Sequence, residues 1–202
     1  MGTRGLWGFY YKKEDKLTYN HYDSYPEGLG NIIKEFITKH SILELKKIAS
    51  KIELIDGRSA PTDKQIQECS AWTDLTVSKQ STEDWYCVLR EAQGNPEAYA
   101  NGLKYMIDSK DFIKDSLFCE YAYIINLDTE KLEFYVGFQK KPQDNRYKHT
   151  TKEVKELQEE RKKLGYKDDD KPYYNCKLHM EIPLSEVKNL SMTMLEKSLN
   201  GN

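Results

Sequence analysis

The sequence has no long run of apolar residues, because charged side chains interrupt every such stretch well before the ~20 residues that a membrane-spanning helix requires. No apolar signal-peptide core follows Arg4, so we expect a soluble, cytoplasmic protein that does not bind membranes. The formal net charge of −2 also lacks the strong basic excess of generic nucleic-acid binders. We therefore expect no generic nucleic-acid binding.

The chain also lacks the paired cysteines of metal and redox centres. Its 4 cysteines are far apart, without a C-x-x-C pair, and they lie within apolar patterns. We expect buried free thiols, no metal and no cofactor. The signatures of known catalytic and phosphate-binding sites are absent as well. Clusters of reactive residue types are therefore the remaining guide to function.

The chain does have enough apolar surface for a core, since 38% of its residues are hydrophobic and 12% are aromatic. Its 202 residues suit one domain, and we expect a single domain over residues 1–202. Residues 1–28 would form an N-terminal hairpin and a site loop, and residues 29–117 a helical insertion. Residues 118–202 would supply a second hairpin, a surface helix, a last strand and a C-terminal helix.

Two aromatic-rich segments near the N-terminus, residues 6–11 and 17–22, flank a charged stretch and predict a β-hairpin. A turn centred on the Glu-Asp pair within that stretch would place Gly8 opposite His21. One face would then carry apolar residues that suit burial beneath helices, and the opposite face would form the floor of a site. The site face carries Arg4, Leu6, Gly8, Tyr10, Tyr19, His21, Asp23 and Tyr25.

The region between residues 29 and 117 is expected to be mainly helical. Capping boxes at Ser41 and Thr62 predict helix starts. Ser81 is expected to cap a further helix that Gly94 stops, and Asn95 to start another that ends near Met106.

The sheet resumes in the second half of the chain. Residues 120–127 and 132–139 predict a second hairpin, and residues 173–182 alternate as a fifth strand. In the simplest register Ala122 lies opposite Gly137, a small-residue spot that could admit a ligand or a packed side chain. Together these elements predict an α+β fold, with an antiparallel or mixed sheet of about five strands and the helices mainly on one face.

Reactive residue types are concentrated between the first hairpin and the first helix. The expected register would bring Arg4 close to His21 and Asp23. The guanidinium of Arg4 could bind an anion through two parallel hydrogen bonds, and His21 with Asp23 would form a histidine–carboxylate pair. Gly28 and Gly30 lead into a helix start, where backbone amides stabilise anions. Arg90, with Glu91 and Gln93, lies at the polar end of a later helix, a second place that could line a pocket. The predicted ligand-binding residues are Arg4, His21, Asp23, Ser24, Tyr25, Gly28, Gly30 and Arg90.

A structural interpretation of these residues stays open. Asp23 or Ser24 could cap a turn, and the glycines could serve tight backbone geometry. Arg4 would then pair with Asp23 on the surface, and Arg90 would be the solvated end of an amphipathic helix.

Three segments carry a resemblance. They are the opening Met-Gly-Thr-Arg-Gly, the stretch Asp-Ser-Tyr-Pro-Glu-Gly-Leu-Gly at residues 23–30, and the stretch at residues 120–128. In these segments the chain resembles an uncharacterised family of small microbial and phage proteins, which implies a grouping without a mechanism. A phage setting would imply a host-interacting or counter-defence role.

The topology of residues 1–40 is also similar to that of N-terminal nucleophile hydrolases, whose mature chains begin on a strand with Cys, Ser or Thr. Removal of the first methionine would expose Gly2 here. Only a further cleavage would expose Thr3 as a nucleophile, which departs from the pattern of those enzymes.

We therefore expect a binding protein for a small, polar, anionic ligand of the nucleotide type. The main alternative is a hydrolase-type enzyme in the same pocket, with His21 as general acid or base and Asp23 orienting it. The second alternative is a protein-interaction module, for which 15 tyrosines supply interface anchors. The sequence leaves the oligomeric state open.

Overall fold

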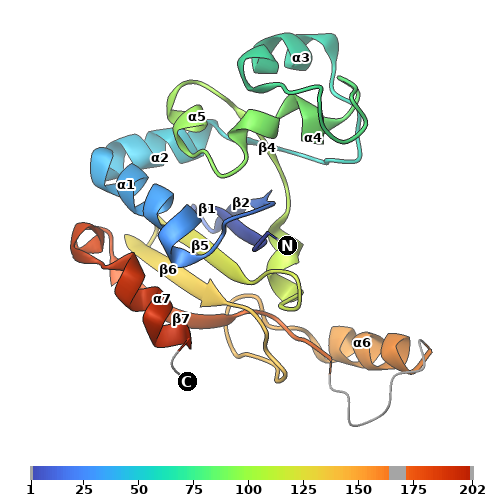
Figure 1. Cartoon of the computed structure of the whole chain (residues 1–202), viewed down its shortest axis with the longest axis vertical. Coiled ribbons are helices and arrows are strands. Elements are labelled where there is room, and N and C mark those ends of the chain that lie inside the picture. Colours follow the sequence, from blue (N-terminus) through green and yellow to red (C-terminus); the bar gives the residue numbers. More distant parts are fainter. Residues whose placement is uncertain (1, 164–171, 201–202) are drawn as a thin grey trace.

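The computed structural model describes residues 2–163 and 172–200, and a mixed five-stranded sheet lies at its centre (Figure 1). The strands are β1 (Gly5–Tyr11), β2 (Glu14–Asn20), β5 (Tyr121–Asn126), β6 (Lys131–Val136) and β7 (Lys177–Pro183). Their order is β2-β1-β5-β6-β7, with β1 parallel to β5 and the other neighbours antiparallel. The predicted α+β fold, with two hairpins and a late strand in one sheet, is confirmed.

The longer helices pack mainly on one face of this sheet (Figure 1). They are α1 (Asn31–Lys39), α2 (Ile42–Lys51) and α7 (Met192–Asn200), whereas α6 (Thr151–Lys163) lies to one side. Phe36 of α1 meets Phe9 of β1 edge to face, with ring centroids 6.3 Å apart, and both are buried. Within the described residues, no helix combines the length and the apolar character that crossing a membrane requires.

The insertion contains a small sheet that the sequence does not predict. Strands β3 (Glu53–Ile55) and β4 (Tyr105–Ile107) pair in parallel. Short helices accompany them: α3 (Asp63–Cys69), α4 (Trp85–Val88) and α5 (Glu97–Ala100). The described residues also contain short helical turns, of which η1 is a π-helix and the others are 3-10 helices: η1 (Pro26–Gly30), η2 (Ser70–Trp72), η3 (Arg90–Ala92), η4 (Lys110–Lys114) and η5 (Val187–Asn189).

The predicted helix starts are confirmed in part. Both capping boxes, at Ser41 and Thr62, are present. The next helix is not capped by Ser81 but by Asp84, whose carboxylate accepts the Tyr86 amide at 3.0 Å. The helix after Asn95 stops early, because the chain soon enters β4 and pairs with β3.

The first hairpin turns earlier than expected, at Lys12 and Lys13, which both have left-handed backbone angles (φ 55° and 63°). Their amides donate to the carboxylate of Asp128 at 2.8 and 2.9 Å, so a residue of the second hairpin fixes this turn. Gly8 consequently pairs with Leu17, and the expected register is wrong. The shift is an even number of residues, so each side chain keeps its expected face.

The face expected to form a site floor is largely buried. Leu6 and Leu17 are inaccessible and belong to a second apolar cluster beneath the segments that follow β4 and β6. Ala122 lies opposite Tyr135 and not opposite Gly137, so a packed aromatic side chain fills the expected small-residue spot. Of the residues expected on this face, Arg4, Tyr10, Tyr19 and Tyr25 are partly exposed, and His21 and Asp23 are exposed.

A charged network holds the segment after β6 over the second cluster. The Nη1 and Nη2 atoms of Arg146 donate to the two carboxylate oxygens of Glu133 at 3.0 and 2.7 Å. The hydroxyl of Tyr147 donates to Asp15 at 2.6 Å. Burial raises the pKa of Asp15, although that hydrogen bond and the charge of Arg146 oppose the effect. The network therefore joins β2, β6 and the 146–147 segment.

The cysteines are buried and carry free thiols, as the sequence predicts. They are Cys69, Cys87, Cys119 and Cys176. Desolvation raises the pKa of Cys69 to about 11, which leaves this thiol a poor nucleophile at neutral pH.

Candidate functional site

The N-terminal segment and the loop after β2 pack against each other. The Ser24 amide donates to the carbonyl of Thr3 at 3.1 Å, and a Cβ added to Gly5 would lie 2.5 Å from that of Ser24. The Ser24 hydroxyl accepts from Asn20 at 2.8 Å, and the Ser24 carbonyl accepts from the Tyr123 hydroxyl at 3.0 Å. Ser24 is fully buried by these contacts, which give its side chain a structural role and do not support the expected ligand contact.

The glycine loop does not have free amides for an anion. The amides of Gly28 and Gly30 donate to the carbonyl of Tyr25 at 3.0 and 3.4 Å, and the amide of Leu29 donates to that of Asp23 at 2.7 Å. Because the loop already uses these donors, its geometry does not support the expected anion contacts of Gly28 and Gly30. Glycine is needed at position 28 for a different reason, because a Cβ there would lie 2.1 Å from the carbonyl oxygen of Asp23.

His21 and Asp23 do not form the expected acid–base pair. The Nδ1 atom of His21 lies 2.9 Å from the hydroxyl of Tyr19, and in the described residues no hydrogen bond joins His21 to Asp23. Asp23 has a left-handed backbone angle (φ 54°), which bends the chain out of the strand. Tyr25 is equally separate, because no hydrogen bond or ring contact in the described part of the chain joins it to Arg4 or His21.

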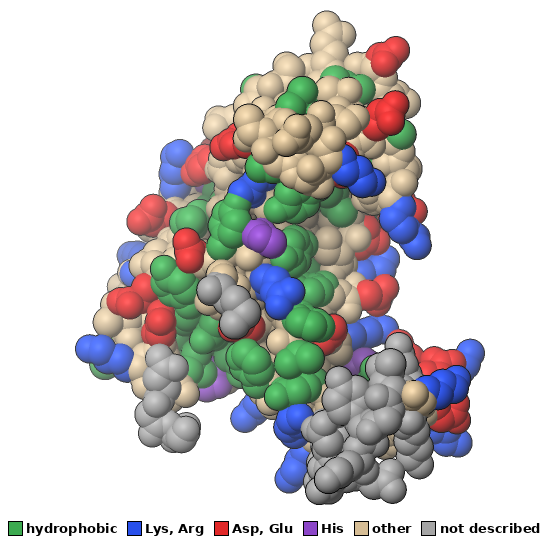
Figure 2. All heavy atoms as spheres, turned by 45° about the vertical axis from the view of Figure 1, so that its right-hand side comes forward, with side chains coloured by type: hydrophobic (Ala, Val, Ile, Leu, Met, Phe, Trp, Pro, Cys, Tyr) green, Lys and Arg blue, Asp and Glu red, His purple; other side chains and the backbone are tan. Residues whose placement is uncertain are grey.

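The structure does bring Arg4, His21 and Arg90 to one surface, which we call the cation–aromatic face. Figure 2 shows apolar side chains along this side of the molecule, with a histidine and basic side chains among them. The Cζ atom of Arg90 lies 4.8 Å from the ring centroid of Tyr22 and 5.7 Å from that of Tyr86. The His21 ring lies 4.8 Å and 6.3 Å from the same tyrosine rings. The face consists of Arg4, Tyr19, His21, Tyr22, Tyr86 and Arg90.

The arginines of this face lack acidic partners. Among the described residues, neither guanidinium forms an ion pair: that of Arg90 donates to the amide oxygen of Gln93 at 3.1 Å, and that of Arg4 lies 4.5 Å above the Phe118 ring. The other arginines with described side chains pair with carboxylates. Partial burial and the positive charges of Arg90 and Arg4 lower the pKa of His21. The two guanidiniums therefore supply positive charge to the face without a protonated histidine.

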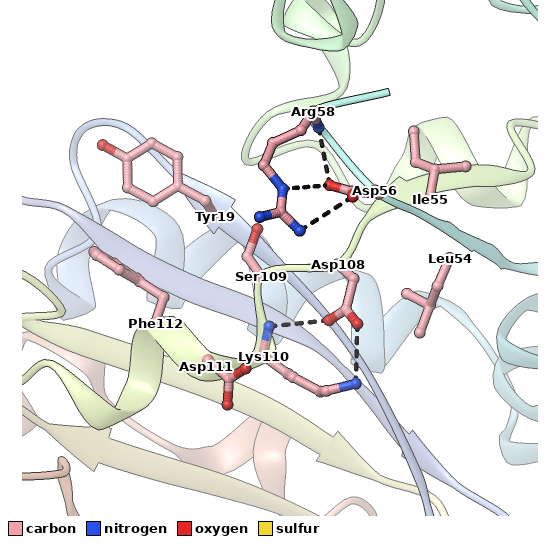
Figure 3. Close-up of a pocket in the computed structure, with 10 residues that line it drawn as sticks. All are labelled: Tyr19, Leu54, Ile55, Asp56, Arg58, Asp108, Ser109, Lys110, Asp111 and Phe112. Carbon is pink, nitrogen blue, oxygen red and sulfur yellow. Dashed lines mark hydrogen bonds and ion pairs between the residues drawn. The ribbon is translucent and has the colours of Figure 1, made fainter. Parts of the chain in front are cut away.

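Two cavities adjoin the face. The small cavity has a volume of about 240 Å³, and Tyr19, Tyr86 and Gln93 border it above a mainly apolar floor. The large cavity has a volume of about 760 Å³ and is bordered by Tyr19, Phe112 and the turn after β3 (Figure 3). Arg90 does not itself border the small cavity, but its guanidinium contacts Tyr86 and Gln93, which do.

Sequence reasoning placed Tyr19 on the site face without assigning it a ligand contact, and it missed Tyr22 and Tyr86. Tyr22 follows His21 directly in the sequence, so the local clustering of aromatic residues could have indicated it. Tyr86 has no such signal, because only the folding of the insertion against the hairpin brings it to His21.

Among the described residues, no group of three or more His, Cys, Asp or Glu side chains could hold a metal ion. Comparisons with known proteins returned no relative: no family model, curated protein or solved structure matches this chain. The geometry of the cation–aromatic face is therefore the remaining guide to function.

The charge of Arg90 gives a direct test of this geometry. Replacing Arg90 with alanine is expected to raise the pKa of His21, because a nearby positive charge that disfavours the imidazolium is removed. NMR titration of the His21 ring proton, assigned with a His21→Asn variant, measures this change. Lys152→Ala on α6, where the lysine side chain is 85% exposed, should leave the pKa unchanged. An unchanged pKa in Arg90→Ala would contradict the placement of Arg90 beside His21.

Proposed function

We propose that this protein binds a small nucleotide-like anion at the cation–aromatic face. The observation that carries the proposal is the pair of guanidiniums, of Arg4 and Arg90, that have aromatic neighbours and no carboxylate partner in the described chain. A guanidinium without an acidic partner keeps its donors available for phosphate or carboxylate oxygens. Arginine planes and tyrosine rings also stack on nucleobases.

The small cavity supplies the other half of the recognition. Its volume of about 240 Å³ lies below the roughly 300–1,000 Å³ of pockets for drug-sized ligands, which suits a single planar ring system. Tyr19 and Tyr86 offer aromatic surface, and Gln93 offers an amide for hydrogen bonds to a base edge. A base in the small cavity would place its phosphate near Arg90. Arg4, across His21, would then add long-range attraction for the anion.

The enzyme alternative receives less support, because the Nδ1 atom of His21 is hydrogen-bonded to the Tyr19 hydroxyl and no described carboxylate orients the ring. The exposed side chains of Tyr22 and Phe118 would also suit a protein partner, but that alternative does not account for the guanidiniums without acidic partners. In the cytoplasm, and in the phage setting that the resemblance implies, removal of a free host nucleotide by binding would be a counter-defence role.

The proposal is tested by calorimetry with AMP, GMP, CMP and UMP, each at the same ionic strength. At least one of them should bind, and Arg90→Ala should weaken its binding about tenfold or more, because a charge-assisted hydrogen bond contributes about 1.5–3 kcal/mol. Adenosine and inorganic phosphate, measured separately, show how much of the affinity comes from the ring and how much from the anion.

Two controls accompany the measurement. Lys152→Ala removes an exposed positive charge on α6 and should bind like the unchanged protein. Thermal unfolding of Arg90→Ala should match that of the unchanged protein, so that loss of binding is not loss of fold. Absence of binding for all four nucleotides, or full affinity in Arg90→Ala, would refute the proposal.

A further inference from the structure

The ring of His21 is held in one orientation by three tyrosines. Its centroid lies 4.8 Å from that of Tyr22, 5.9 Å from that of Tyr19 and 6.3 Å from that of Tyr86, and each pair of rings meets edge to face. The Tyr19 hydroxyl also lies 2.9 Å from the Nδ1 atom. His21 is exposed, and its Nε2 atom has no hydrogen-bond partner within the described residues. The open hydrogen-bonding position of this ordered ring is therefore Nε2.

The hydroxyl of Tyr19 suits both protonation states of this ring. Burial raises the pKa of Tyr19, so the phenol keeps its proton at neutral pH and can donate a hydrogen bond to Nδ1 of a neutral imidazole. When the ring is protonated, Nδ1 carries a proton, and the phenol oxygen can accept the hydrogen bond. With Nδ1 engaged by Tyr19 in either way, Nε2 carries a proton and can donate to a ligand.

The charged groups that act on His21 are both positive. Arg90 contacts the same two rings as His21, those of Tyr22 and Tyr86. Partial burial and the charges of Arg90 and Arg4 lower the pKa of His21, so the imidazolium is disfavoured in the free protein. An anion bound beside the ring would reverse this effect, because it would supply an opposite charge.

The carboxylates on the elements around His21 do not provide that opposite charge. Asp84 accepts the amide of Tyr86 at 3.0 Å and the hydroxyl of Ser78 at 2.8 Å. Among the described residues, no hydrogen bond or ion pair joins His21 to a carboxylate, and the charged groups that act on its pKa are the two arginines. The carboxylates on these elements are Asp23, Asp84 and Glu91. The ring therefore lacks a counter-ion of its own.

We infer that His21 contacts the phosphate of the nucleotide directly, donating from Nε2 beside the guanidinium of Arg90, and that the ring takes up a proton from solvent at Nδ1 when the phosphate binds. This inference rests on the proposed function and deepens it, because the site then binds its anion together with a proton. The phosphate is the counter-ion that favours the imidazolium. By linkage, the protonated ring binds the phosphate more tightly than the neutral ring does.

The test follows the ring proton of His21 by NMR across pH. The full chain is measured free and saturated with whichever of AMP, GMP, CMP and UMP binds most tightly. The nucleotide should raise the pKa of His21 by about one pH unit or more, because an opposite charge at contact distance shifts a pKa by about 1–3. The matching nucleoside has the base without the phosphate, so it should leave the pKa unchanged.

His21→Gln is the matched control for calorimetry, because the glutamine amide keeps a hydrogen-bond donor and cannot take up a proton. Titrations at pH 7 in two buffers of different ionisation enthalpy count the protons taken up on binding. The unchanged protein should take up more than His21→Gln, and this difference excludes protonation of the phosphate itself. His21→Gln should also bind the nucleotide about fivefold more weakly, since a neutral contact replaces a charge-assisted one.

The outcomes separate the two proposals. A bound nucleotide that leaves the pKa of His21 unchanged, or proton uptake that is equal in His21→Gln and the unchanged protein, would overturn the inference while the proposed function stands. A rise in the pKa that the nucleoside causes equally would assign the contact to the base and would also overturn the inference. Absence of binding by all four nucleotides would refute the proposed function, and the inference with it.

Discussion

Replacing Arg146 with methionine should lower the free energy of unfolding by about 3 kcal/mol, because removal of one partner strands the other as a buried charge. Glu133 is 3% exposed, and Arg146 supplies both hydrogen bonds that neutralise its carboxylate. The hydrogen bonds from Asn126 and Tyr135 remain, but they bring no positive charge. Equilibrium unfolding in urea, monitored by tryptophan fluorescence and by circular dichroism, measures the loss.

A second variant and a control show whether the stranded charge is the cause. Adding Glu133→Gln to Arg146→Met should recover part of the stability, because the amide removes the charge while keeping the shape of the side chain. Lys46→Met breaks a surface pair between Lys46 and Glu130 and should cost less than about 1 kcal/mol. A loss in Arg146→Met no larger than that of Lys46→Met would contradict the account of the network.

The sheet was predictable because its strands carry a strong local signal. Alternating aromatic and apolar residues identify both hairpins, and the alternation alone assigns Trp7 and Phe9 to the helix-covered face. The register was not predictable, since the left-handed turn at Lys12 and Lys13 depends on Asp128, which comes from the other hairpin. The same limit applies to β3 and β4, whose three residues each are too few for a periodic pattern and pair only across the insertion.

The candidate site was predictable to a similar extent. The composition around His21 drew attention to this region, and the charges of Arg4 and Arg90 both act on His21. Ser24 and the glycines were ambiguous in the sequence, because the residue types that suit an anion-binding loop also suit a tight loop that uses its own hydrogen bonds. Only the three-dimensional positions of the carbonyls of Asp23 and Tyr25 show that the amides of this loop are already used.

The tight geometry of this loop predicts a second large loss of stability, in a Gly28→Ala variant. Gly28→Ala should lower the free energy of unfolding by about 3 kcal/mol, because overpacking a rigid site costs about 1–3 kcal/mol and a lost hydrogen bond adds to it. The new Cβ would lie 2.1 Å from the carbonyl oxygen of Asp23, a backbone atom that cannot move without breaking its bond to the Leu29 amide at 2.7 Å. Urea unfolding measures the loss.

Nucleotide binding by the folded protein distinguishes the structural role from the anion-loop hypothesis. If Gly28 serves only the close approach to Asp23, Gly28→Ala should bind AMP as the unchanged protein does, at a temperature well below the unfolding transition. Gly102→Ala is the matched control, because Gly102 has a positive φ of 106° and no atom within 4 Å of an added Cβ, so it adds backbone strain without a collision. It should be less destabilising than Gly28→Ala. Unchanged stability with lost AMP binding in Gly28→Ala would instead return the loop to the ligand site.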